Sequence, residues 1–287
     1  MKWQNREGSR NVEDHRGRRM RRIGGGIGIG TVLLLLLGLF LGQNPMSILN
    51  QIQTQPVPET SPGNYQADDV DKPLVDFVSV VLKDNEDVWN KLFRENYGKD
   101  YPEPKLVLYS GMDRSGCGVA QTATGPFYCP ADQKVYLDLS FFREMKSRFH
   151  APGDFAMAYV ISHEVGHHIQ NLFGITDKVA RQRSRMSKRD GNRLSVRLEL
   201  QADYLAGVWA HHDQKMKNIL EEGDLEEAIR AAASVGDDRI QKSAGSYVIP
   251  DAFTHGTSEQ RVRWFTKGLR SGDMNGGDTF SVPYNQL

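Results

Sequence analysis

His163-Glu164-Val165-Gly166-His167 is the stretch that decides how this chain of 287 residues is interpreted. Residues four apart share one face of a helix, so the rings of His163 and His167 can bind a single zinc ion. Glu164 lies one position further round, where its carboxylate can take a proton from water that the ion has made acidic. The motif is short and occurs by chance, so its surroundings must support it.

The flanking residues predict that the motif lies on a helix. Gly174 is suited to a helix C-terminus, and Gly166 places no side chain beside the metal, which leaves room for a backbone segment or a ligand. Apolar side chains recur at helical spacing before and after the motif, at Ala158, Ile161, Val165 and Leu172.

A catalytic zinc site needs a third protein ligand. A histidine six residues after His167 would supply it in one large class of zinc peptidases, but Phe173 stands there. Glu199 and Asp203 are four apart in a stretch with helical character. We predict that Glu199 binds zinc and that Asp203 accepts the remaining ring N–H of a zinc-binding histidine. An ordinary acidic helix face is the alternative.

The two motifs together, His-Glu-x-x-His and Glu-x-x-Ala-Asp, resemble those of the gluzincin zinc metallopeptidases. The chain as a whole resembles a bacterial family of membrane-anchored neutral zinc metallopeptidases. This resemblance implies a zinc-peptidase fold and a membrane anchor, but it implies no substrate. The other matching pieces are residues 1–4, 11–14, 125–130 and 253–257.

The resemblance also assigns a role to His255. The stretch His-Gly-x-x-x-x-Arg, from His255 to Arg261, is similar to a His-Pro-x-x-x-x-Arg segment of some membrane gluzincins, with Gly256 in place of Pro. It implies that His255 donates a hydrogen bond to the tetrahedral intermediate and that Arg261 supports the site. A loop histidine without a role is the alternative. Three further histidines are predicted to be surface or cap residues: His168, His211 and His212.

The N-terminal region predicts a membrane anchor. Residues 1–22 carry eight Lys and Arg against three acidic residues and have no periodic apolar face, which predicts a disordered basic cytoplasmic tail. Residues 23–42 are twenty uncharged residues, long enough as a helix to cross the ~30 Å bilayer core. The arginines before this helix predict that the N-terminus stays in the cytoplasm. The rest of the chain then lies in the periplasm or outside the cell.

A cleaved signal peptide is the alternative to an anchor, but the basic segment is long and no Ala-x-Ala site follows Leu41. Small residues four apart in the anchor, Gly24 with Gly28 and Gly38 with Gly42, are suited to pairing two copies in a homo-oligomer. We exclude nucleic acid as a partner, because the basic tail is short and has Trp3 as its one aromatic residue.

Residues 43–66 read as a proline-containing linker, and residues 67–287 as one catalytic domain. We predict an α+β fold that is mainly helical, with a small sheet beside the zinc helix. Strands are expected at 105–109 and 134–139. We expect residues 135–139 to be the sheet edge that binds an extended peptide, with a core strand as the alternative.

Cys117 and Cys129 are the two cysteines of the chain. In an exported domain we expect them to form a disulfide, and two free thiols are the alternative. A basic run covers residues 178–197. It reads as a solvated helix face, with contact to anionic lipid or to an acidic substrate segment as the alternative.

Together these features predict a membrane-anchored, zinc-dependent peptidase that hydrolyses a peptide or protein substrate outside the cytoplasmic membrane. An endopeptidase is favoured over an exopeptidase. Glu164 is the expected general base, which later returns the proton to the leaving amine. The alternative is a non-catalytic zinc-binding scaffold or partner-binding protein of the envelope. Glu164 distinguishes the two, because a structural zinc site needs no base.

Overall fold

The computed structural model describes residues 1–17, 71–122, 125–147, 153–243 and 248–287. Residues 1–16 and the described residues from 71 onward belong to one compact unit. The predicted membrane helix at 23–42 and the linker at 43–66 lie outside the described residues. Within the described ranges, no helix combines the length and the apolar character needed to cross a bilayer.

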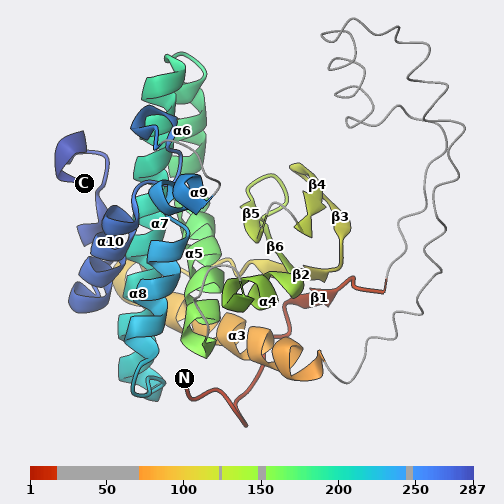
Figure 1. The fold of residues 1–287 in the computed structure, drawn as a ribbon. Coiled ribbons are helices and arrows are strands. Elements are labelled where there is room, and N and C mark those ends of the chain that lie inside the picture. The colour runs from red at the N-terminus through yellow and green to blue at the C-terminus, as the bar shows by residue number, and fades with distance from the viewer. Residues whose placement is uncertain (18–70, 123–124, 148–152, 244–247) are drawn as a thin grey trace, which may run out of the picture. The chain divides into compact units, whose positions relative to one another are not determined.

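A four-stranded sheet forms one side of the unit (Figure 1). Its order is β1-β2-β6-β5, in which β1, β2 and β6 run parallel and β5 runs antiparallel to β6. A separate hairpin pairs β3 with β4. The strands are β1 (Val12–Asp14), β2 (Lys105–Tyr109), β3 (Met112–Ser115), β4 (Gly118–Gln121), β5 (Phe127–Cys129) and β6 (Lys134–Asp138).

The expectation that residues 135–139 form a peptide-binding edge is wrong. β6 lies between β2 and β5, and its inner residues are fully buried, as are those of β2. A strand covered on both faces reads as a continuous apolar run, and that is the pattern both strands have. The edge strand next to the motif helix is β5.

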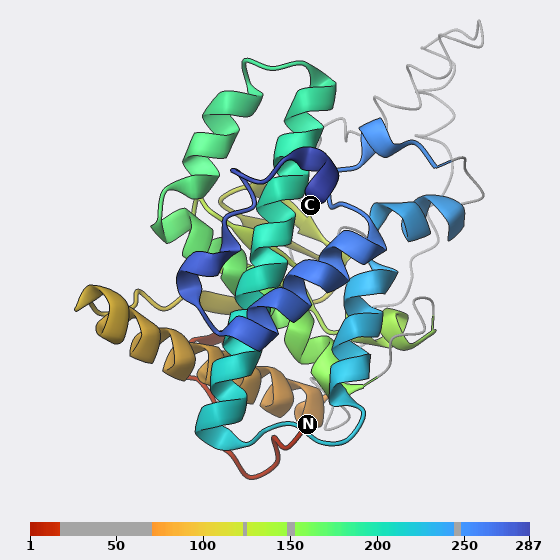
Figure 2. The ribbon, with the colours of Figure 1, turned by 90° about the vertical axis from the view of Figure 1, so that its left-hand side faces the viewer.

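Helices form the other side of the unit, with α5 between the sheet and the helices α7, α8 and α10, whereas α4 lies beside the sheet and α3 runs beneath the sheet and α5 (Figures 1 and 2). Both the α+β class and the helix over the motif are confirmed. The helices are α3 (Lys72–Tyr97), α4 (Ser140–Ser147), α5 (Asp154–Leu172), α6 (Ile175–Arg183), α7 (Lys188–Lys217), α8 (Asp224–Ser234), α9 (Asp237–Ser243) and α10 (Ser258–Ser271). Short 3₁₀ turns follow at η2 (Pro250–Ala252), η3 (Met274–Gly277) and η4 (Tyr284–Gln286).

Glycines let α7 approach its neighbours closely. A Cβ at Gly166 on α5 would lie 3.0 Å from the carbonyl oxygen of Ala202 on α7. A Cβ at Gly268 on α10 would lie 2.0 Å from the carbonyl oxygen of Tyr204 on α7, which no larger residue tolerates. The space that Gly166 leaves is therefore occupied by the backbone of α7, and α7 carries the predicted third ligand.

The prediction of a disordered tail at residues 1–22 is wrong for residues 1–16. β1 pairs with β2 in register, with Val12 opposite Leu106. The Trp3 indole N–H donates to Asp154 Oδ2 at 2.7 Å, and its ring meets Phe77 edge-on at 5.4 Å between centroids. The composition of residues 1–16 did not predict that they are ordered, because single polar and aromatic contacts hold the segment rather than a periodic apolar face.

The predicted division of the chain at a membrane does not agree with this arrangement. A helix spanning at residues 23–42 would leave residues 1–22 on one side and residues 67–287 on the other. A strand cannot hydrogen-bond to a sheet across a bilayer, and β1 lies in the same sheet as β2. Both parts must therefore fold in one compartment.

The predicted disulfide is confirmed. Cys117 and Cys129 are joined, with their Cα atoms 5.7 Å apart. The bond ties the turn between β3 and β4 to the end of β5. It therefore restrains the edge strand that lies beside the motif helix.

Candidate metal centre

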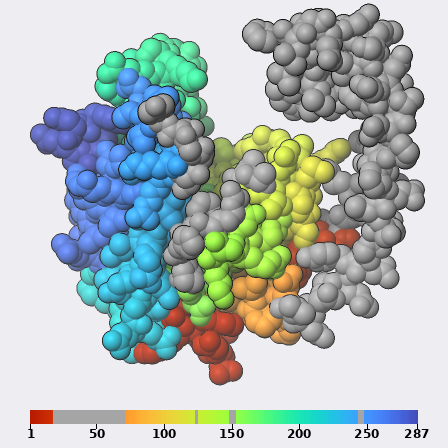
Figure 3. Space-filling model, in the orientation of Figure 1, coloured from red at the N-terminus to blue at the C-terminus, as the bar shows by residue number. Residues whose placement is uncertain are grey.

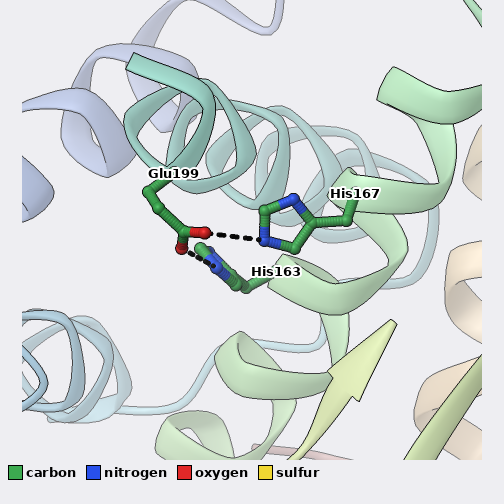
Figure 4. A group of neighbouring side chains, drawn as sticks. All are labelled: His163, His167 and Glu199. Carbon is green, nitrogen blue, oxygen red and sulfur yellow. Dashed lines mark hydrogen bonds and ion pairs between the residues drawn. The ribbon is translucent and has the colours of Figure 1, made fainter. Parts of the chain in front are cut away.

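Two helices bring the predicted zinc ligands together. His163 and His167 project from α5, and Glu199 projects from the middle of α7 (Figure 4). Nε2 of His163 lies 3.2 Å from Oε2 of Glu199, and Nε2 of His167 lies 3.5 Å from Oε1 of the same carboxylate. All three potential ligand atoms lie within 4.8 Å of one another.

The outer nitrogen of His163 is held by a buried carboxylate, as predicted. Nδ1 of His163 lies 2.9 Å from Oδ1 of Asp203, which is fully buried. Arg261 donates to both oxygens of Asp203, at 2.9 Å each, and the Tyr159 hydroxyl donates to Oδ1 at 2.5 Å. Asp203 is thus fixed from three sides and keeps the Nδ1–H tautomer of His163.

Gln170 holds the outer nitrogen of His167, as Asp203 holds that of His163. Gln170 was not identified from the sequence. Its Oε1 lies 2.8 Å from Nδ1 of His167, and its Nε2 donates to the carbonyl oxygen of Leu198 at 2.7 Å. Gln170 is fully buried. Its position three residues after His167, on the same helix face, was the available signal.

The donor set fits zinc. Each histidine has its Nδ1 opposite a hydrogen-bond acceptor, which leaves the lone pair on Nε2, and both Nε2 atoms face Glu199. Two imidazole nitrogens and one carboxylate are the ligands of many catalytic zinc sites, which keep a fourth position open. Within the described ranges, no other group of three His, Cys, Asp or Glu side chains converges in this way.

The charges in the site also suit a cation. Burial raises the pKa of Glu199, but His167 and His163 outweigh it and bring that pKa well below its usual value. Burial lowers the pKa of His163, but Asp203 and Glu199 outweigh it and raise that pKa to about 9, so without a metal ion the ring is protonated at neutral pH and must release the Nε2 proton to bind one. Glu199 is therefore ionised at neutral pH, as a metal ligand must be.

Glu164 lies beside these ligands but takes a different partner. Its Oε2 accepts the backbone N–H of Tyr128, in the edge strand β5, at 2.8 Å. Only 8% of Glu164 is exposed, and burial raises the pKa of its carboxyl group. A carboxyl group with a raised pKa is suited to accepting and returning a proton near neutral pH.

A cavity of about 600 Å³ opens over the centre. His163, His167 and Glu199 line it together with Glu164. Its other walls come from β5, α4, α5, α9 and the loop before α10, and include Phe127, Tyr128, Phe141, Val160, Ile240 and His255.

His255 lies in this cavity wall, and Asp237 holds it there. Oδ1 of Asp237 lies 3.2 Å from Nδ1 of His255. Its Oδ2 accepts the backbone N–H groups of Thr254, His255 and Gly256 at 2.7, 2.6 and 3.1 Å. Sequence reasoning missed Asp237, because nothing in the pattern links residues 237 and 255.

The expectation for His168 is wrong, because His168 is fully buried. Its Nδ1 contacts the Tyr128 hydroxyl at 2.9 Å and its Nε2 contacts the carbonyl oxygen of Pro102 at 2.6 Å. Burial lowers the pKa of His168 to about 4, so the ring is neutral. His211 and His212 contact the carbonyl oxygens of Leu269 and Gly272 at the end of α10, as expected of cap residues.

Comparison with known proteins now gives the family. A family model described as "Putative neutral zinc metallopeptidase" matches residues 1–280. The chain belongs to this family. The match includes the N-terminal segment that carries β1, and it spans α5 and α7, which carry the candidate metal ligands.

One relative matches this chain over nearly its whole length, and another matches about two thirds of it. "Uncharacterized protein YpfJ" of Escherichia coli K12 is 46% identical over 286 residues, which is 98% of this chain and 99% of that protein. "Uncharacterized protein Rv2575" of Mycobacterium tuberculosis is 42% identical over 192 residues, 63% of this chain and 64% of that protein. No solved structure matches the chain.

Proposed function

We propose that this member of the family is an active zinc-dependent peptidase. The observation that carries the proposal is Glu164, which is buried beside three converging ligands without belonging to them. His163, His167 and Glu199 would hold the ion. Zinc, when bound there, supplies a Lewis acid that makes water acidic and polarises a carbonyl group.

The residues around the ligands would transfer the proton, stabilise the oxyanion and orient the histidine rings. Glu164 takes the proton from the attacking water and returns it to the leaving amine. His255, oriented by Asp237, donates a hydrogen bond to the oxyanion that develops on the substrate. Asp203 and Gln170 keep the two histidine rings in the binding tautomer.

The substrate is proposed to be an extended peptide laid along β5. This strand is the outer edge of the sheet and also lines the metal-site cavity. An edge strand binds a peptide through backbone groups, which gives affinity without requiring a free terminus, although in β5 the Tyr128 N–H is already held by Glu164. An endopeptidase is therefore favoured. The Cys117–Cys129 bond supports an oxidising compartment outside the cytoplasmic membrane for the folded unit.

A non-catalytic zinc protein is the second candidate, and one observation favours it. The contact between Glu164 and the backbone of Tyr128 also braces α5 against β5, which gives Glu164 a structural reason to be present. In that case the metal would stabilise the unit and no peptide would be cut.

Metal analysis and cleavage of a peptide library by the full-length protein test the proposal. We expect one zinc per chain and cleavage that a chelator abolishes. Glu199→Ala should lose most of the bound zinc, whereas Glu144→Ala, a change at the cavity wall, should keep it. Full zinc with no cleavage across the library would favour the scaffold, and wild-type zinc in Glu199→Ala would show that another residue is the ligand.

A further inference from the structure

A second cavity lies behind the metal centre. It has a volume of about 660 Å³ and shares no lining residue with the metal-site cavity. It is lined by the C-terminal ends of α3 and α5, by α6, by residues 194–205 of α7 and by the segment from 274 to 281. α6 and α7 form a hairpin (Figure 2), and its connecting end projects from one end of the folded unit in the space-filling view (Figure 3). The volume is typical of sites that bind small molecules.

The walls of this second cavity are largely apolar. Phe173 is 44% exposed and Tyr97 39%, although their rings pack together at 5.4 Å between centroids. Apolar surface that a chain leaves uncovered in a concave site favours an apolar ligand group. The other apolar wall residues are Ile169, Ile175, Val179, Leu194, Leu205, Met274 and Phe280.

The charged groups in the wall are cationic on balance. Lys178 is exposed and has no ion-pair partner among the described residues. Nη1 of Arg197 donates to the carbonyl oxygens of Thr279 and Val282, and the nearby Asp278 carboxylate offsets part of its charge. Asp278, the one acidic wall residue, already accepts backbone N–H groups within its own turn.

We propose that this cavity binds a small amphipathic anion. The apolar part of such a molecule would cover Phe173, Val179 and Leu194. Its carboxylate, or a group of similar charge, would lie at Lys178 and Arg197. Neither the metal ligands nor Glu164 take part, so the proposal stands apart from the peptidase chemistry. Gln170 lines this cavity and also holds His167, so the ligand would lie directly behind one metal ligand.

Decanoate and 1-decanol, matched in chain length, serve as probes. Hydrogen–deuterium exchange of the full-length protein, followed by mass spectrometry, reports which segments each probe protects. We expect decanoate to slow exchange saturably in residues 169–182 and 274–281. Decanol lacks the charge and should need a roughly tenfold higher concentration for half-maximal protection. Lys178→Gln should remove most of the difference between the two probes.

Two variants fill the cavity and one serves as the matched control. Ile175→Trp and Leu194→Trp replace partly buried wall residues and should abolish protection by decanoate. Val119→Trp adds the same ring at an exposed site on β4 and should leave it unchanged. Circular dichroism shows whether each variant folds. If one of the two tryptophan variants that fill the cavity does not fold, the other is used for the test.

Three results would overturn the proposal. The first is the absence of protection in these segments, and the second is equal protection in the filling variants. The third is exchange in these segments that slows as the protein concentration rises, with no probe present. A second copy of the chain, rather than a small anion, would then cover the cavity.

Discussion

Nδ1 of His163 lies 2.9 Å from Oδ1 of the buried Asp203, on the side of the ring that faces away from Glu199. The same carboxylate binds the guanidinium of Arg261 through both of its oxygens. Arg261 and His163 outweigh the effect of burial and lower the pKa of Asp203 to about 2. Asp203 is therefore a fixed negative charge that orients one metal ligand.

We expect Asp203→Ala to weaken zinc binding about 10–100-fold, the usual effect of removing the partner of a metal-binding histidine. Competition with a chromogenic chelator measures the affinity. Asp213→Asn, at another buried aspartate of α7, is the control and should bind zinc as the wild type does. Unchanged affinity in Asp203→Ala would show that Asp203 does not act on the metal centre.

Gln170→Leu should also weaken zinc binding about tenfold or more, because His167 loses the acceptor that fixes its tautomer. Leucine is similar in size, so the effect on packing is small. Gln170→Glu keeps an acceptor for His167 but loses the N–H that binds the Leu198 carbonyl, so it should recover only part of the affinity. Equal affinities in the leucine and glutamate variants would contradict this role. Gln182→Leu, in the wall of the second cavity, is the control.

Stability should depend on pH through a buried acidic pair. Asp84 on α3 and Asp213 on α7 are fully buried, and Arg6 of the N-terminal segment forms an ion pair with Asp84. Lys217 lies 2.7 Å from Asp84 and 3.8 Å from Asp213. Burial, followed by the Asp84 carboxylate, raises the pKa of Asp213 from 3.8 to about 7.

A carboxyl group with a raised pKa binds its proton more tightly in the folded state. Its stabilising effect is complete below the unfolded pKa and is lost as pH rises through about 7. We expect this group to make the melting temperature fall between about pH 4 and 7, and the fall to be smaller in Asp213→Asn, whose amide mimics the protonated acid. An equal fall in both proteins would contradict the assignment.

Asp87 provides the matched control for this pH dependence. Burial raises its pKa, but Lys217 and Lys83 outweigh burial and lower it. Its contribution to stability is therefore present at neutral pH and is lost only as pH falls below its usual range. Asp87→Asn should lower the melting temperature at neutral pH and leave its slope between about pH 5 and 7 unchanged.

Residues 1–16 and the described residues from 71 onward should lie on the same side of any membrane, because β1 and β2 share a sheet. Gln4→Cys and Lys99→Cys place single thiols at exposed positions in the two parts, while the native cysteines are bonded. If the folded unit lies outside the cytoplasmic membrane, as proposed above, a membrane-impermeant maleimide added to intact cells should label both variants. Labelling of one variant alone would mean that a membrane separates the two parts.

The sequence predicted the parts of the site that depend on helical spacing. His163, His167, Glu199 and Asp203 each lie four residues from a partner on one helix, and short-range periodicity places such pairs reliably. Gly166 indicated a close neighbour, which proved to be the backbone of α7.

The parts that sequence reasoning missed depend on contacts between distant segments. Asp237 holds His255 across a loop, and the order of the strands decides that β5 rather than β6 is the edge. Residues 1–16 were read as disordered because their composition is polar. In the structure those polar groups meet buried partners, such as Asp84 for Arg6.

Glu164→Gln tests the central claim, because it separates metal binding from catalysis. Glutamine keeps the size of the side chain and an oxygen that can accept the Tyr128 N–H, but it cannot take a proton. The three ligands are untouched, so zinc content and melting temperature should equal those of the wild type. Loss of a general base typically slows the reaction by ~10²–10⁴-fold.

The decisive measurement is the cleavage rate of a library-derived peptide by wild type and Glu164→Gln, each with its zinc content determined. The account predicts one zinc per chain in both proteins and a rate at least about 100-fold lower in the variant. Equal rates with equal zinc would contradict it, because Glu164 would then not be the base.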